Sequence, residues 1–146
     1  MYEFLAWRVG DAMTREPVTV RPETTIADVE ELFDARDFDA LPVLAGDGGL
    51  AGIVSKLDVL QAYHFTPETI VPPYEEIRRR PVRTVMSSQP LTVGPELPLT
   101  RALETLVATR VKSLPVVEGG RLVGIVARED VLRALRRAAA GEGPPR

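Results

Sequence analysis

Apolar residues recur with helical spacing in two separate stretches of the chain. In the first stretch Ile26, Val29 and Phe33 fall on one side of a helix, while acidic residues occupy the opposite side. In the second stretch Leu99 and Leu106 belong to a similar stripe. Residues three and four positions apart share one face of a helix, so each stretch is predicted to form an amphipathic helix.

Short apolar runs typical of β-strands surround each of these helices. One run precedes the helix and two follow it. The runs are residues 18–20, 41–45 and 50–54 in the first half and residues 91–93, 114–117 and 121–126 in the second half. Glycine-rich turns join the last two runs of each half, which predicts β-hairpins, because hairpin turns need positive φ. A phosphate-binding loop would instead lead into a helix. A closing helix is predicted to begin near Lys56 and near Arg128.

The two halves are copies of one unit. Residues 13–23 align with 86–96 without a gap, and residues 41–43 align with 114–116 at the same offset of 73. After one deletion, residues 52–60 align with 124–132. We therefore predict an α+β fold in which two βαββα repeats pack about a pseudo-twofold axis. The predicted segments are repeat 1 at 9–63, a linker at 64–81, repeat 2 at 82–137 and a disordered tail at 138–146.

Composition narrows the classes of function. Twenty-one acidic against eighteen basic residues give a net charge of -3, which argues against a nucleic-acid partner. The absence of cysteine excludes disulfides and zinc–thiolate sites. The start of the chain lacks the pattern of a signal peptide, and no apolar run approaches the roughly 18 residues of a membrane span. We expect a cytoplasmic protein that is not in a membrane.

Motifs typical of catalysis are also absent from the sequence. His64 is the only histidine and has no metal-ligating residues around it in the sequence, and neither a Ser/His/Asp set nor an HExxH motif is present. We expect no enzyme activity, no catalytic residues, no catalytic cofactor and no metal site. Two arginine clusters, residues 78–83 and 133–137, are more typical of solvated surfaces than of a phosphate-binding face.

The junction between the last strand and the closing helix has a chemistry of its own. Ser55 ends a strand and can cap the following helix, whose first N–H groups and dipole favour an anion. Asp58 lies one turn later, where its carboxylate can accept hydrogen bonds from a ribose diol. The alternative is a capping box, in which both side chains bind only the backbone.

These motifs resemble those of the cystathionine-β-synthase (CBS) domain pair, also called a Bateman module. The matching blocks are residues 18–22, 41–43 and 52–58 and, in the second copy, residues 91–95, 114–116 and 124–130. The resemblance implies a regulatory module that binds AMP, ADP, ATP or S-adenosylmethionine in clefts between its repeats. It also implies a homodimer that signals to a partner protein, whose identity the sequence does not reveal.

In the family each cleft combines the Asp of one repeat with strands of the other. Carried over, the resemblance makes Ser55, Lys56 and Asp58 face Pro90, Leu91, Val111, Lys112, Leu114 and Pro115. It makes Arg128 and Asp130 face Pro17, Val18, Phe38, Asp39, Leu41 and Pro42. Because Ala127 lacks a hydroxyl and Asp39 stands where Lys112 stands in the other copy, we expect the Ser55/Asp58 cleft to bind nucleotide better.

Two other functions remain open from the sequence. One is a ligand-free dimerisation or scaffold module in which the clefts are simply packed. The other is a nucleic-acid-associated regulator that uses the arginine clusters.

Overall fold

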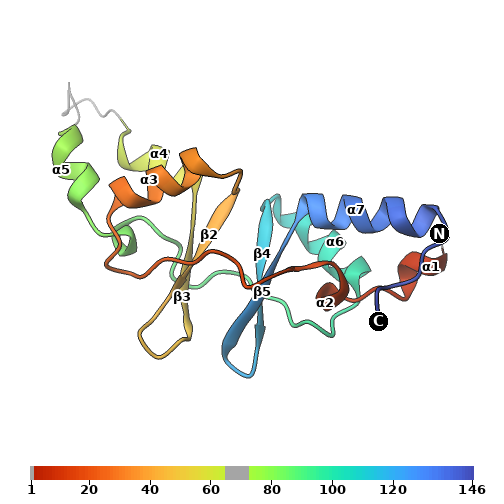
Figure 1. Cartoon of the computed structure of the whole chain (residues 1–146). Coiled ribbons are helices and arrows are strands. Elements are labelled where there is room, and N and C mark those ends of the chain that lie inside the picture. The colour runs from red at the N-terminus through yellow and green to blue at the C-terminus, as the bar shows by residue number, and fades with distance from the viewer. Residues whose placement is uncertain (1, 65–72) are drawn as a thin grey trace. The chain divides into compact units, whose positions relative to one another are not determined.

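The computed structural model describes residues 2–64 and 73–146, which fall into two compact units (Figure 1). One unit, Val18–Gln89, holds the helix and hairpin of the first repeat, and we call it the first-repeat unit. The other joins Met1–Pro17 to Pro90–Arg146, and we call it the second-repeat unit. The mixture of helix and sheet agrees with the predicted α+β fold.

The first-repeat unit is an antiparallel hairpin covered by short helices. Its elements are α3 (Ile26–Ala35), β2 (Ala40–Leu44), β3 (Leu50–Ser55), α4 (Lys56–Ala62), α5 (Tyr74–Arg79) and the 3-10 helix η1 (Val82–Thr84). The hairpin turn uses Gly48 at φ 87°, as the glycine tract predicts. Ile26 and Val29 of α3 pack with Leu41 and Val43 of β2 to form the buried core of this unit.

The second-repeat unit has the same hairpin with longer helices. Its elements are α1 (Tyr2–Leu5), α2 (Val9–Ala12), β1 (Thr14–Arg15), α6 (Leu99–Thr109), β4 (Ser113–Glu118), β5 (Arg121–Ala127) and α7 (Arg128–Ala139). The strands form a sheet in the order β1-β5-β4. Figure 1 shows α6 and α7 beside this sheet, and Leu106 and Val131 from these helices pack on Leu114 and Val126 of its strands.

The predicted first strand of each repeat is shorter in the structure than expected. Residues 18–20 contribute a single parallel bridge between Val20 and Val43, and residues 91–93 contribute one between Val93 and Val116. Prolines on both sides of Val20 lack an N–H and restrict the neighbouring backbone, so pairing does not extend beyond this bridge.

The two repeats exchange their N-terminal segments. Thr14 precedes the first repeat's hairpin but pairs with Ile125 in the second-repeat unit, whereas Ser87 pairs with Ile53 in the first-repeat unit. The Ser87 N–H donates to the Ile53 carbonyl at 2.9 Å, and the reverse bond measures 3.0 Å. The compact units therefore differ from the repeats predicted at 9–63 and 82–137.

The C-terminal residues differ from the disordered tail predicted for residues 138–146. Helix α7 continues to Ala139, and Ala138 is buried because it extends the apolar face of Val131 and Ala134 by another turn. Beyond the helix, Arg146 donates a hydrogen bond to the Ala6 carbonyl and pairs with the Asp11 carboxylate of α2.

The linker predicted at 64–81 is partly described. Residues 65–72 lie outside the described residues, and α5 follows them as the single helical segment expected near Tyr74. Ile77 of α5 is buried, and Arg78 pairs with Glu30 of α3 at 2.9 Å. These contacts attach the end of the linker to the first-repeat unit.

The exchanged segments approach the hairpins closely because each crossing point is a glycine. A Cβ at Gly124 would lie 2.6 Å from the Met13 sulfur and 2.8 Å from the Thr14 carbonyl oxygen. We predict that Gly124→Ala lowers the free energy of unfolding by about 1–3 kcal/mol, the usual cost of overpacking. Urea denaturation measures this, with Gly94→Ala as the control, because only one atom lies near that position, at 3.9 Å. Equal effects of both substitutions would contradict the close approach.

Candidate functional site

Both strand-to-helix junctions are closed by a carboxylate three residues into the helix. At the first junction, Ser55–Asp58, the Ser55 N–H donates to Asp58 Oδ2 at 2.8 Å. The Asp58 N–H in turn donates to the Ser55 hydroxyl at 3.2 Å. This is the reciprocal capping box that the sequence left open as an alternative, and it fixes the orientation of the Asp58 carboxylate. Asp58 stays half-buried, so part of the carboxylate faces outward.

The second junction, Ala127–Asp130, has half of that arrangement. The Ala127 N–H donates to Asp130 Oδ2 at 2.7 Å, but Ala127 offers no side-chain acceptor in return. Asp130 is only 5% exposed, and its other oxygen accepts from the Arg133 guanidinium at 3.1 Å. At the position of Arg133 the first repeat has Gln61. The two carboxylates are therefore held alike by the backbone but differ in burial and charge partner.

The charges around the two junctions differ in sign at two of three equivalent positions. At equivalent positions, the first-repeat unit carries Asp37, Asp39 and Lys56, whereas the second-repeat unit carries Arg110, Lys112 and Arg128. Pairing of Ala40 with Ser55 brings the chain that follows Asp37 and Asp39 to the first junction, and the Arg128 N–H donates to the Lys112 carbonyl at the second, at 3.0 Å. The second junction is therefore the more favourable environment for an anion.

Two of the predicted cationic residues already have partners. The Arg128 guanidinium donates to the carbonyls of Arg110 and Val111, at 2.7 and 3.2 Å, where α6 ends. It stabilises the carbonyl end of that helix, as a cation there should. The Lys56 ammonium lies 6.0 Å from the centre of the Phe33 ring. Either side chain would have to leave these partners, at least in part, to meet a phosphate directly.

The remaining predicted residues are divided between core and surface. Leu41, Pro42, Leu114 and Pro115 are buried, and the two leucines belong to the hydrophobic cores. Those at intermediate exposure are Pro17, Val18, Phe38, Asp39 and Pro90, and those exposed are Leu91, Val111 and Lys112.

Each unit brings together its own members of the predicted site. The first-repeat unit holds Ser55 and Asp58 with the strand that contains Leu41 and Pro42, and the second-repeat unit holds Asp130 with the strand that contains Leu114. The combination across repeats that the resemblance implies stays a prediction.

Ser113 is a polar residue beside the second junction that sequence reasoning missed. It pairs directly with Ala127, and it is 7% exposed. Its hydroxyl oxygen has no hydrogen-bond partner among the described residues. The repeat alignment contained a signal, because Ser113 aligns with Ala40, and Ala40 pairs with Ser55.

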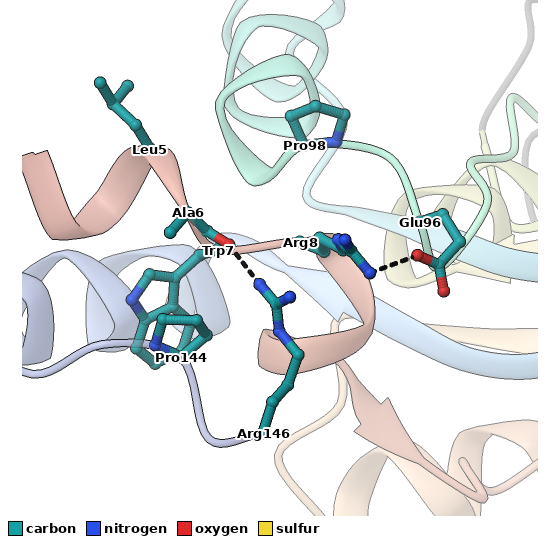
Figure 2. A pocket seen from close by; sticks show the side chains of 8 residues that line it. All are labelled: Leu5, Ala6, Trp7, Arg8, Glu96, Pro98, Pro144 and Arg146. Atoms are coloured by element: carbon teal, nitrogen blue, oxygen red, sulfur yellow. Dashed lines mark hydrogen bonds and ion pairs between the residues drawn. The ribbon is translucent and has the colours of Figure 1, made fainter.

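A separate hollow of about 520 Å³ lies elsewhere in the second-repeat unit (Figure 2). Figure 2 shows Arg8 paired with Glu96, at 2.7 Å, and Arg146 bonded to the Ala6 carbonyl. Its charged groups thus pair with protein atoms, and none of the predicted ligand-binding residues lines it.

Three further features of residues 2–64 and 73–146 bear on the expectations from the sequence. No group of three or more potential metal ligands is present there. No helix in this part of the chain is both long and apolar enough to cross a membrane. Several arginines of the two clusters pair with acids, as Arg80 does with Glu76 and Arg137 with Glu142. These pairs agree with the solvated surface predicted for them.

Comparisons with known proteins place these features in a family. The sequence matches the CBS domain over residues 9–64 and again over 82–137. A CBS domain-containing protein of Dictyostelium discoideum is 32% identical, with 87% of this chain and 90% of that protein covered. Inosine-5'-monophosphate dehydrogenase of Korarchaeum cryptofilum is 30% identical over 85% of this chain, which spans only 23% of that enzyme.

Solved structures agree with the sequence matches. The CBS-pair protein CBSX2 of Arabidopsis thaliana superposes with a TM-score of 0.81 at 30% identity, covering 92% of this chain and 98% of that one. A structure of CBSX2 in complex with AMP gives a TM-score of 0.78 at 30% identity, covering 91% and 98%.

We predict that substitutions at the two helix caps change the free energy of unfolding in opposite directions. Ser55→Ala removes the acceptor for the Asp58 N–H and should lower the free energy of unfolding by about 1 kcal/mol. Ala127→Ser is the matched reverse change and should raise it by a similar amount, because α7 starts without a side-chain cap. Urea denaturation of both variants measures the difference. A loss of stability in Ala127→Ser would show that the junctions are not equivalent in backbone geometry.

Proposed function

Because the chain belongs to the CBS domain family and carries that domain twice, we propose that it is a regulatory module that binds an adenosine-containing ligand. The observation that carries the proposal is the oriented carboxylate at each strand-to-helix junction. Asp58 and Asp130 are both held by the N–H of the residue three positions earlier. Candidate ligands are AMP, ADP, ATP and S-adenosylmethionine.

The chemistry of the junction suits a ribose. A carboxylate has about four lone-pair sites, and the backbone N–H at the first junction uses only one of them. The remaining sites of Asp58 can accept both hydroxyls of a ribose diol in charge-assisted hydrogen bonds. The AMP complex of CBSX2, at 30% identity, supports a nucleoside monophosphate as the first ligand to try.

The module acts by binding rather than by catalysis. A ligand that prefers one arrangement of the two units shifts the population toward that arrangement, and it can do so only by its difference in affinity. The chain crosses from one unit to the other after Pro17 and again after Gln89. A ligand-induced change at the strand-to-helix junction of one unit can therefore be transmitted to the other unit through these two crossings. We propose that this change is passed on to a partner protein in the cytoplasm.

A second candidate function is self-association, either as part of regulation or as the sole role of a ligand-free scaffold. Helices α6 and α7 border an apolar groove of about 320 Å³. Within it Val107 is 70% exposed and Leu132 is 60% exposed, which is unusual for residues of their size. Leu60, at the position equivalent to Leu132, is also exposed. We propose that the groove pairs with a second copy of the chain to form a homodimer.

Ligand binding is tested by a thermal-shift titration of the full chain with AMP, ADP, ATP and S-adenosylmethionine. A ligand at 100 times its Kd adds about 2.7 kcal/mol of stability, enough to raise Tm by several degrees. The double variant Asp58→Ala/Asp130→Ala should abolish this shift, because it removes both carboxylates. Asp34→Ala, which removes an exposed carboxylate on α3, is the control and should leave it unchanged. No shift with any of these ligands would favour the ligand-free scaffold.

Self-association is tested by sedimentation of the free chain at several concentrations. Leu132→Glu places a charge in the α6–α7 groove and should convert the dimer to a monomer. Leu5→Glu is the matched control, because Leu5 is similarly exposed in the same unit but lies outside the groove. A wild-type chain that stays monomeric, or equal effects of both variants, would contradict this interface.

A further inference from the structure

The hydroxyl that the second junction lacks at Ala127 is present on the neighbouring strand. In the first-repeat unit Ala40 pairs with Ser55, and in the second-repeat unit Ser113 pairs with Ala127. Each pair thus contains one serine and one alanine, but the serine has changed strands. Directly opposed residues of antiparallel strands point to the same face, with Cβ atoms about 5 Å apart. Relative to Ser55 in the first-repeat unit, the hydroxyl of Ser113 therefore lies on the other strand of the hairpin but on the same face.

The two hydroxyls differ in what they already bind. The Ser55 hydroxyl accepts the Asp58 N–H and so belongs to the helix cap. The Ser113 hydroxyl, in contrast, has no partner among the described residues, although Ser113 is 7% exposed. A buried hydroxyl without a hydrogen bond is costly, and in a folded protein such a group calls for an explanation. Ligand binding is an explanation consistent with the position of Ser113 at the strand-to-helix junction.

The surroundings of Ser113 favour a polar and anionic ligand. It alternates along β4 with Leu114, whose side chain is in the core, so Ser113 points to the other face of the sheet. Lys112 precedes it, and the Arg128 N–H holds the Lys112 carbonyl at the start of α7. Asp130 accepts the N–H of Ala127, the residue that Ser113 opposes. Ser113, Asp130 and Lys112 therefore all belong to one strand-to-helix junction.

We propose that Ser113 is a ligand-binding residue of the second junction and hydrogen-bonds the same nucleotide as Asp130. This inference rests on the proposed function. It differs from the expectation drawn from Ala127 and Asp39, because here the second junction keeps a hydroxyl on Ser113 and has cations where the first has Asp37 and Asp39. Both junctions are therefore competent to bind, and the second accepts a phosphate-bearing ligand.

The test isolates each junction by removing the carboxylate of the other. AMP affinity is measured by calorimetry for Asp58→Ala, which leaves the second junction, and for Asp130→Ala, which leaves the first. Ser113→Ala is then added to each. In the Asp58→Ala chain it should weaken AMP binding about five- to tenfold, the effect of one lost hydrogen bond. In the Asp130→Ala chain it should leave the affinity unchanged.

Controls separate ligand binding from a purely structural role. Ser113→Ala removes an unpaired buried hydroxyl, so the Tm of the free chain should stay the same or rise. Adding Ala127→Ser places a hydroxyl at the position equivalent to Ser55 and should restore part of the AMP affinity. The proposal is overturned if Asp58→Ala alone abolishes AMP binding, or if Ser113→Ala changes only the Asp130→Ala chain or neither. A wild-type chain that binds no adenosine ligand would instead reject the proposed function itself.

Discussion

A hydrogen bond from a strand-end N–H to a carboxylate three residues later determines the direction in which each closing helix leaves its hairpin. It is present at Ser55 and Asp58 and again at Ala127 and Asp130, at 2.8 and 2.7 Å. The bond pairs an N–H that would otherwise lack a partner where the chain turns from strand to helix. It also holds a negative charge near the first turn, where the helix dipole favours it. One interaction therefore builds the junction and presents the group proposed to bind ribose.

Much of this arrangement could be predicted from the sequence, because it depends on local patterns. The helical spacing around Ile26 and Leu99, the glycine turns and the closing helices after Ser55 and Ala127 all follow from short-range chemistry. The exchange of segments could not be predicted, because it depends on where Met13 and Met86 find space beside a glycine. The contact between Arg146 and the Ala6 carbonyl could not be predicted for a similar reason, since it joins distant parts of the chain.

The two interpretations of the junction do not exclude each other. The capping box is present at the first junction, and the carboxylate that takes part in it still has lone pairs for a ligand. The expectation that the second junction binds more weakly came from comparing aligned residues, Ala127 with Ser55 and Asp39 with Lys112. Pairing across the hairpin brings Ser113 to Ala127, and a linear comparison of the repeats does not include that neighbour. The two junctions therefore differ in their charges and in which strand carries the hydroxyl, and both contain a hydroxyl.

The central claim is that a nucleotide binds where the two carboxylates are held. An AMP titration followed by amide chemical shifts in NMR tests it most directly, because it reports each backbone N–H separately. The account predicts that the amides of Ser55, Asp58, Ala127 and Asp130 shift with increasing AMP, together with that of Ser113. Shifts confined to other parts of the chain, or none at saturating AMP, would contradict it.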